Sequence, residues 1–410
     1  MLFLAGDIGG TKALLQLSYN PPEIPYGLET YYDSAHSKLP ANHSIQIAKQ
    51  RYECAEFDSL ESIINHFLSK ALSAENLVTL TSAHPCLGAI RSNDLERIQS
   101  ACFGLPGPVN GRIVELTNLP WKVDAQKIEQ ACSIQSVHFV NDFYAAASGI
   151  ESLSDEDVIS LYSPLQQTTE AGNRLVVGAG TGLGVAPVFY DGQDYTPVPC
   201  EGGHFDFAPI SETQQSLLTW LWQQWSHVSY ERVLSGPGLE ALYMFFKTFD
   251  YPNSYVIENN EDSAGLKKQT LKSDLNKQID VHIADNIKSP LFSLRENTLK
   301  TLSAIQISQA AEAGDEIAIK AVTEFVTIYG AFVGAVSLVW HAPQGIYLAG
   351  GIATKILPWM QKPYFEKAFL EKGRMSKVVA NMPVFIVMDE GLGLKGAMRQ
   401  NYVYAKRMGQ

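Results

Sequence analysis

The sequence predicts an α/β protein made of two related halves, and two observations carry this prediction. An apolar strand followed by a glycine-rich turn occurs three times, at Gly6, Gly178 and Gly350. The chain also has 410 residues, and chains of this length usually divide into domains that each have their own hydrophobic core. Hydrophobic residues make up 46% of the chain and the mean hydropathy is -0.05, values typical of a globular protein. We therefore expect two lobes that face each other across a cleft.

Apolar runs bounded by turn residues predict the strands. They cover residues 2–6, 12–18, 98–103, 137–140, 346–349 and 384–387. A capping-box pattern, Asp58 with Glu61, predicts a helix through Ala71. Further helices are expected after residue 142, from Ser235 to Phe249, over 315–340 and after residue 391, whereas 19–49 is expected to be mostly loop.

Composition excludes several classes of function. The net charge of -12 disfavours nucleic acid, which binds to a basic face. The five cysteines show no metal-ligand or redox spacing, which indicates reduced thiols in the cytoplasm. No export signal is recognised, and the apolar stretch at 328–340 is too short to span a bilayer. We expect no membrane partner.

Two glycine-rich turns predict phosphate binding. The first run is Gly6-Asp7-Ile8-Gly9-Gly10-Thr11, and the second extends from Gly178 through Gly180-Thr181-Gly182 to Gly184. Backbone N–H groups in such turns attract phosphate oxygens, and a chain without Cβ atoms lets the ligand approach. Neither run has the spacing of a dinucleotide fingerprint or a P-loop. One run alone would be explained as an ordinary tight turn, but two behind apolar strands favour a phosphotransferase that uses ATP.

One carboxylate stands at the end of another predicted strand, in Asn141-Asp142-Phe143. Ligands of open α/β sheets bind at the carboxyl ends of the strands, so Asp142 is a candidate general base. Its alternative role is a helix cap. Polar groups suited to a sugar follow in Glu201-Gly202-Gly203-His204 and at Glu231. Each of these alone has a structural alternative, such as a surface Glu or a structural His.

Several segments together resemble the bacterial glucokinase family, within the actin-like sugar kinase superfamily. The similar segments are 6–11, 105–109, 117–121, 141–143, 178–184, 201–204, 231–239 and 348–352. The resemblance implies a two-domain actin-like, ribonuclease H-like fold. A small domain would comprise residues 1–152 plus 386–410, and a large domain residues 153–385 with a polar insertion near 250–300. It also implies a cytoplasmic homodimer.

The resemblance implies ATP-dependent phosphorylation of glucose at its 6-hydroxyl, with Asp142 as general base and Mg²⁺ as cofactor. Asp7 would face the Mg²⁺ through water. Sugar contacts are expected from Asn118, Asn141, Asp142, Glu201, His204 and Glu231. Nucleotide contacts are expected from Gly6, Asp7, Ile8, Gly9, Gly10, Thr11, Gly180, Thr181, Gly182, Gly350 and Gly351.

Three other functions stay open at this point. The chain could phosphorylate another hexose, such as mannose, fructose or an amino sugar. It could be a sugar-sensing regulator without catalysis, although Asp142 and the expected lack of a DNA-binding segment disfavour this. It could also be an actin-like assembly ATPase, which would have no need of Glu201, His204 and Glu231.

Overall fold

The computed structural model describes residues 1–20, 44–83, 98–116, 119–165, 171–250 and 302–408. The chain divides into two compact units, a first unit of residues 1–205 and 326–410 and a second unit of residues 206–325. The domain boundaries expected after residues 152 and 385 stay a prediction. The predicted polar insertion at 250–300 falls, apart from its first residue, outside the described residues.

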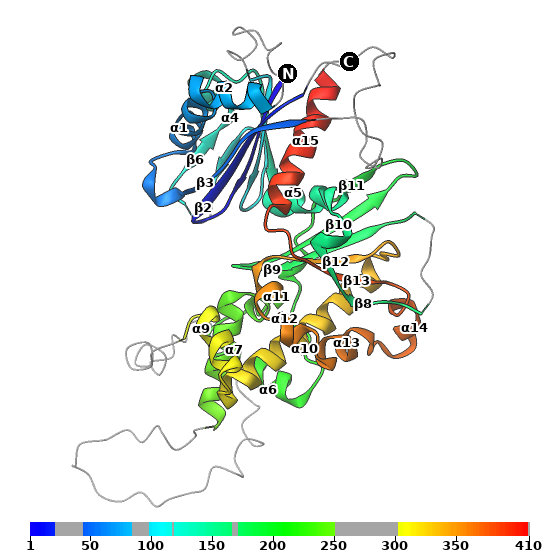
Figure 1. Cartoon of the computed structure of the whole chain (residues 1–410). Coiled ribbons are helices and arrows are strands. Elements are labelled where there is room, and N and C mark those ends of the chain that lie inside the picture. The colour runs from blue at the N-terminus through cyan, green and yellow to red at the C-terminus, as the bar shows by residue number, and fades with distance from the viewer. Residues whose placement is uncertain (21–43, 84–97, 117–118, 166–170, 251–301, 409–410) are drawn as a thin grey trace, which may run out of the picture. The chain divides into compact units, whose positions relative to one another are not determined.

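The first unit begins with a five-stranded sheet, the first sheet, in the order β3-β2-β1-β4-β7. Its strands are β1 (Leu2–Ile8), β2 (Lys12–Tyr19), β3 (Ile45–Glu53), β4 (Ser100–Leu105) and β7 (Val137–Asn141). β1 pairs with β2 antiparallel and with β4 parallel, and β4 pairs with β7 parallel. The carboxyl ends of β1, β4 and β7 therefore meet at one edge of the sheet. Figure 1 shows this sheet with β2 and β3 labelled.

The second sheet of the same unit repeats this topology, in the order β11-β10-β9-β12-β13-β8. Its strands are β8 (Val158–Tyr162), β9 (Arg174–Ala179), β10 (Leu183–Tyr190), β11 (Tyr195–Pro197), β12 (Ile346–Ala349) and β13 (Val384–Val387). β9 again pairs with its hairpin partner antiparallel and with β12 parallel, and β12 with β13 parallel. The prediction of two related halves is confirmed. A short ribbon, β5 (Ile113–Glu115) with β6 (Lys122–Asp124), completes the strands of the described residues.

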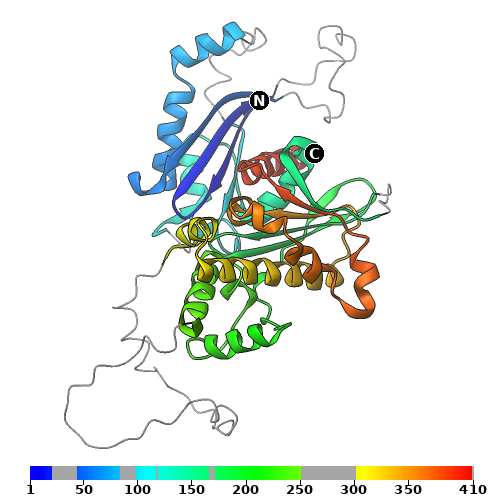
Figure 2. The same ribbon diagram turned by 60° about the horizontal axis from the view of Figure 1, so that its bottom comes forward.

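Helices cover both faces of the first sheet. The helices α1 (Leu60–Ala71) and α4 (Ala125–Ala131) share the core of one face, and α2 (Ala74–Ala83) contacts α1. The other face contacts α5 (Asp142–Gly149) and the C-terminal helix α15 (Leu392–Met408), which lie side by side (Figure 2). α5 also packs on the second sheet through Ala147 and Phe143. This short helix is therefore shared by both sheets.

Small residues let α5 and α15 approach closely. A Cβ placed on Gly396 would lie 1.6 Å from the backbone oxygen of Ala145, and one on Gly149 would lie 2.4 Å from that of Leu392. Between them, Gln400 donates a hydrogen bond to the Ser148 hydroxyl at 2.9 Å. The crossing of these helices depends on glycine at both contact points.

The long helix α10 (Glu316–Val339) confirms the helix predicted over 315–340. It is the one helix among the described residues with the length and apolar composition to cross a membrane, but 67% of its most apolar window is buried inside the protein. A core helix has this property. Gly330 and Gly334 allow its close packing on α13 (Pro363–Leu370), since added Cβ atoms would lie 2.2 and 2.4 Å from the backbone oxygens of Phe365 and Phe369.

The remaining helices are short or belong to the second unit. The first unit also contains α11 (Gly351–Lys355), α12 (Leu357–Met360) and α14 (Ser376–Val379). The second unit contains α6 (Glu212–Leu221), α7 (Gly236–Asp250) and α9 (Ala304–Glu312). The Ser235 hydroxyl accepts a hydrogen bond from the N–H of Gly238, which confirms Ser235 as the cap of α7.

Three local predictions were wrong. Residues 45–49, expected to be loop, belong to β3, an edge strand in which only Ile47 and Tyr52 are buried, so that its apolar pattern is weak. β4 covers Ser100–Leu105, so it begins two residues later and ends two residues later than the strand predicted over 98–103. The cap of α1 is Ser59, not Asp58, because the Ser59 hydroxyl accepts the N–H of Ser62.

We predict that Gly396→Ala destabilises the first unit by about 1–3 kcal/mol, the usual cost of overpacking a core. The added methyl would collide with the backbone of α5. Thermal unfolding of the purified variant measures this effect. Lys406→Ala, an exposed change in the same helix, is the control and should leave the midpoint unchanged. Equal stability of the two variants would contradict the close crossing.

Candidate active site

The first sheet brings together two aspartates. Asp7 lies near the end of β1, and Asp142 follows directly after β7. β4 lies between these strands and pairs Gly104 with Asp7. A Cβ on Gly104 would lie 3.6 Å from the Asp142 Cα and 3.8 Å from Asp7 Oδ1. The same Cβ would lie 3.2 Å from the Cβ of Ala145, so glycine at this position lets α5 pack closely on β4 beside the two acidic residues.

The cap of α5 is Asn141, not Asp142. The Asn141 Oδ1 atom accepts hydrogen bonds from the N–H groups of Phe143 and Tyr144, at 2.9 and 3.0 Å. Its Nδ2 atom donates to the backbone oxygen of Gly107 at 3.0 Å. Asp142 stands at the first helical position, where its Oδ1 atom accepts from the N–H of Phe143 at 2.7 Å. Asn141 therefore caps the helix, and Asp142 is not needed for that role.

Both aspartates hold their protons more tightly than a carboxyl group in water. Burial raises the pKa of Asp142 to about 6, hydrogen bonds from Phe143 and Asn141 oppose the shift, and the Glu201 charge adds to it. Burial, followed by the Asp142 charge, raises the pKa of Asp7 to about 6, while Arg51 opposes this. The electrostatic influence of Glu201 on Asp142 also shows that this predicted sugar ligand lies near the aspartate.

The C-terminal helix closes the space around Asp7. A Cβ on Gly393, in the first turn of α15, would lie 2.6 Å from Asp7 Oδ2. The carboxylate therefore faces the N-terminal end of a 17-residue helix, where backbone N–H groups favour negative charge. The first and last elements of the chain meet at this point of the site.

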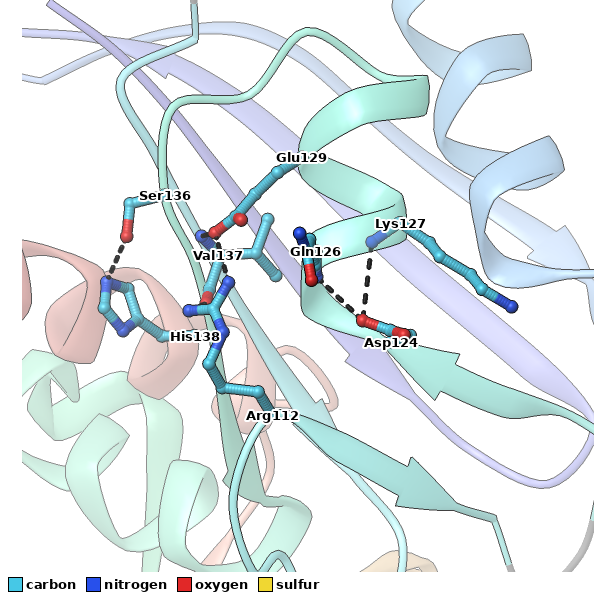
Figure 3. A network of polar contacts seen from close by, with 8 residues as sticks. All are labelled: Arg112, Asp124, Gln126, Lys127, Glu129, Ser136, Val137 and His138. Carbon is cyan, nitrogen blue, oxygen red and sulfur yellow. Dashed lines mark hydrogen bonds and ion pairs between the residues drawn. The ribbon is translucent and has the colours of Figure 1, made fainter.

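The strand that carries Asn141 is fixed at its other end by an ionic network (Figure 3). Glu129 of α4 accepts from the N–H of Val137 at 2.9 Å and pairs with Arg112 at 2.6 Å. Arg112 in turn donates to the backbone oxygen of Val137 at 3.4 Å. Asp124 caps α4 through the N–H groups of Gln126 and Lys127. Both peptide groups of the first residue of β7 are thereby held.

The second glycine turn connects β9 to β10. The N–H of Gly180 donates to the backbone oxygen of Gly182 at 2.8 Å, and Thr181 at the tip is exposed. A Cβ on Gly180 would meet nothing within 4 Å, so the turn is open to a ligand. Gly350 lies beside it with φ 91°, and its own Cβ would lie 2.6 Å from the Ala179 oxygen. The structure therefore places the glycines of this second turn beside Gly350, which precedes the exposed Gly351.

The Glu-Gly-Gly-His segment packs on the same hairpin. It forms a 3₁₀ turn over Gly202–His204, in which the N–H of His204 donates to the Glu201 oxygen at 3.0 Å. A Cβ on Gly203 would lie 1.9 Å from the Leu183 oxygen in β10. The side chains of Glu201 and His204 are exposed. Both side chains are therefore accessible to a ligand, and the turn that carries them packs so closely on β10 that only glycine fits at position 203.

The first glycine turn connects β1 to β2. The N–H of Gly9 donates to the Lys12 oxygen at 2.8 Å, Gly10 is half-buried and Thr11 is exposed. Ile8 is fully buried in the core, which leaves only its backbone for a ligand. Gly6 has a packing role, since its Cβ would lie 2.5 Å from the Phe103 ring.

Two predicted sugar ligands, Glu231 and Asn118, are not among the site residues that the structure describes in the first unit. Glu231 belongs to the second unit, in a 3₁₀ turn over Tyr230–Arg232, where its backbone oxygen accepts from the Ser235 hydroxyl at 2.7 Å. Asn118 lies outside the described residues.

No group of three or more His, Cys, Asp or Glu side chains in the described part of the chain is arranged to hold a metal ion. A single half-buried carboxylate, Asp7, borders the first glycine turn. This donor set does not suit a protein-held metal, but it fits Mg²⁺ carried by a nucleotide, which keeps several waters and needs one or two carboxylates.

Comparison with known proteins identifies the family. The family model for glucokinase matches residues 4–402. A glucokinase of Nostoc sp. (strain PCC 7120) is 32% identical over 404 residues, covering 97% of this chain and 97% of the relative. The chain belongs to the glucokinase family. As a glucokinase-family protein it is an enzyme, a hexose kinase, and the resemblance found in the sequence is confirmed.

Further relatives agree with this glucokinase assignment. A glucokinase of Synechocystis sp. (strain PCC 6803) is 32% identical over 400 residues and is covered to 96%. A solved glucokinase from an Antarctic psychrotroph has a TM-score of 0.66 and 25% identity, covering 98% of this chain and 99% of that one. The glucokinase of Balamuthia mandrillaris, solved with glucose, matches at a TM-score of 0.61 and 17% identity over 98% of this chain and 93% of that one. The predicted actin-like α/β fold is confirmed.

Sequence reasoning missed four residues around the aspartates. They are Arg51, Gly104, Phe143 and Gly393. Gly104 lies just beyond the strand predicted over 98–103, and Gly393 follows the predicted start of the last helix without any motif of its own. Gly104 lies beside Asp7 because β1 pairs with β4, and Gly393 lies beside Asp7 because α15 packs there. Neither contact can be read from a local sequence motif.

We predict that Asp142→Asn increases stability at neutral pH. A carboxyl group whose pKa is raised in the folded state, here to about 6, contributes stability that is present below its unfolded pKa, near 4, and lost as pH rises through about 6. The amide cannot ionise and avoids this loss. Chemical denaturation should show the variant more stable than wild type by on the order of 1–2 kcal/mol at pH 7.5, with little difference below about pH 4. The control is Asp155→Asn, an exposed site, which should show no such pH-dependent gain.

Proposed function

We propose that this glucokinase-family protein transfers the γ-phosphoryl group of ATP to the 6-hydroxyl of D-glucose, with Asp142 as general base. The single observation that supports this most is the position of Asp142. It stands at the carboxyl edge of the first sheet, relieved of capping by Asn141 and within electrostatic range of both Asp7 and Glu201.

The base needs to be ionised near neutral pH and still able to take a proton. A carboxyl group with a pKa of about 6 meets both requirements, because the best base has a pKa close to the working pH. The hydrogen bond from the Phe143 N–H holds one carboxylate oxygen, and the other would accept the proton of the sugar hydroxyl. Proton removal makes that hydroxyl a better nucleophile toward phosphorus.

The triphosphate would be held by backbone N–H groups of the two glycine turns, Gly9–Thr11 and Gly180–Gly182. The net charge of -12 provides no general attraction for a nucleotide, so local donors must supply it. Asp7 would hold water molecules of nucleotide-bound Mg²⁺, an ion that neutralises charge on the phosphates. Gly350 and Gly351 would let the adenosine approach the backbone.

Glucose would be bound by groups that match its hydroxyls. Glu201 accepts hydrogen bonds, and His204 donates or accepts them. The Asn141 amide is engaged by the protein through its capping oxygen, its bond to Gly107 and its hydrogen bond to Asp142, so a contact with the sugar would replace one of these bonds. Glu231 of the second unit and Asn118 would complete the set. A site that leaves polar groups unpaired with the wrong epimer discriminates strongly between hexoses.

The expected course of the reaction is closure on the sugar, exclusion of water and in-line attack on the γ-phosphorus. Exclusion of water would limit ATP hydrolysis without sugar. We further propose that the enzyme works in glycolysis, in the cytoplasm, as a homodimer without nucleic-acid or membrane partners. Sedimentation of the purified protein tests the dimer, and a monomer at assay concentrations would rule it out.

We predict that Asp142→Asn lowers kcat by about 10²–10⁴-fold, the usual contribution of general-base catalysis. Glucose affinity should stay near the wild-type value, because the amide has nearly the shape of the carboxylate. A coupled assay gives kcat, and equilibrium titration gives the affinity. The wild-type rate should also fall as pH drops through about 6, since the base becomes protonated. A variant with near-normal kcat would remove Asp142 from this role.

The substrate prediction is that, with ATP and Mg²⁺, glucose gives a higher kcat/KM than mannose, fructose or glucosamine. A hexose panel with purified enzyme measures this directly. A higher value for another sugar would identify a kinase for that hexose. Sugar binding without turnover would indicate a regulator, and sugar-independent ATP hydrolysis with filament formation would indicate an assembly ATPase.

A further inference from the structure

We propose that Phe143 is a positioning residue whose ring fixes the second glycine turn relative to the Asp142 carboxylate. The inference rests on the proposed function, because it assigns the ring a part in the same phosphoryl transfer. It explains why glycine occupies two positions of the hairpin that lie outside the turn itself.

The ring occupies a space made by two missing side chains. Gly178 of β9 and Gly184 of β10 are direct cross-strand partners. A Cβ on Gly178 would lie 2.6 Å from the Phe143 ring, and one on Gly184 would lie 2.4 Å from it. Two facing glycines thus form a flat seat on the hairpin, and the ring rests on it. Any other residue at either position would displace the ring or the hairpin.

This seat lies close to the proposed phosphate site. One further cross-strand pair, Ala179 with Leu183, separates it from the Gly180–Gly182 turn. The backbone of Leu183 also contacts Gly203, in the segment that carries Glu201 and His204. A shift of the hairpin would therefore move the proposed phosphate and sugar contacts together.

Phe143 is also connected directly to the proposed base, Asp142. Phe143 follows Asp142 directly in α5, and its N–H donates to Asp142 Oδ1 at 2.7 Å. The same N–H lies 2.9 Å from the capping oxygen of Asn141. Any movement of Phe143 therefore changes the hydrogen bond that orients the carboxylate.

The consequence is kinetic. Phosphoryl transfer needs the base, the acceptor hydroxyl and the γ-phosphorus in line, and a displacement of about 1 Å can cost about 10²-fold in rate. Loss of the ring would leave each binding group intact but alter their spacing to Asp142. We expect a lower kcat with nearly unchanged KM values for glucose and ATP.

A double-mutant cycle in the full-length enzyme tests this. Gly184→Ala should lower kcat by about 100-fold in wild type, because its methyl would meet the ring. In a Phe143→Ala background the methyl has room, so the same change should cost less than about 5-fold. Phe143→Leu keeps part of the ring's volume and should retain more kcat than Phe143→Ala. The KM values should stay within about 3-fold throughout.

The control is Phe139→Leu, which removes a half-buried ring from β7 on the face away from the hairpin and should leave kcat unchanged. Thermal unfolding of every variant reports which ones fold, and Phe143→Leu serves if Phe143→Ala does not. Additive effects of Gly184→Ala and Phe143→Ala on kcat, or a Phe143→Leu enzyme with wild-type kcat, would overturn the inference. The proposed function fails separately, if wild type does not phosphorylate glucose or Asp142→Asn keeps its rate.

Discussion

The site depends on keeping two negative side chains near each other in partly buried surroundings. Asp7 and Asp142 each have a pKa raised to about 6, with burial as the main cause, and the charge of one raises the pKa of the other. The backbone brings them together because β1 and β7 flank β4 in parallel. The fold tolerates this repulsion through glycine at positions 104 and 393, N–H donors at Asp142 and the helix end that faces Asp7.

Glycine serves two different purposes in this protein. In the Gly180–Gly182 turn the absence of side chains leaves open space. At Gly178, Gly184, Gly203 and Gly350 it instead permits contact with a neighbouring ring or backbone oxygen. Since most of these contacts converge on the β9–β10 hairpin, this hairpin positions the Gly180–Gly182 turn, the segment that carries Glu201 and His204, and Gly350. α5 connects that hairpin to the base, because it packs on both sheets.

Much of the fold followed from local patterns. The strands 346–349 and 384–387 were predicted with their observed bounds, and the repeat of strand and glycine turn predicted the two similar sheets. The edge strand β3 was not predicted, because a strand with only two buried residues has little apolar periodicity. Motifs identified Asp7, Asp142 and Glu201, which the structure brings together. They could not identify Gly104, Gly393 or the seat of Phe143, because contacts between distant segments create those roles.

The contact between Gly393 and Asp7 has a consequence for synthesis of the protein. The first strand is synthesised well before α15, the helix that borders its aspartate. Until then, Phe3, which stacks on Tyr402 at 5.1 Å, lacks its aromatic neighbour. A prematurely terminated product would therefore present an uncovered apolar sheet face, a surface that chaperones and proteases act on. The surroundings of Asp7 are thus complete only after α15 has been synthesised.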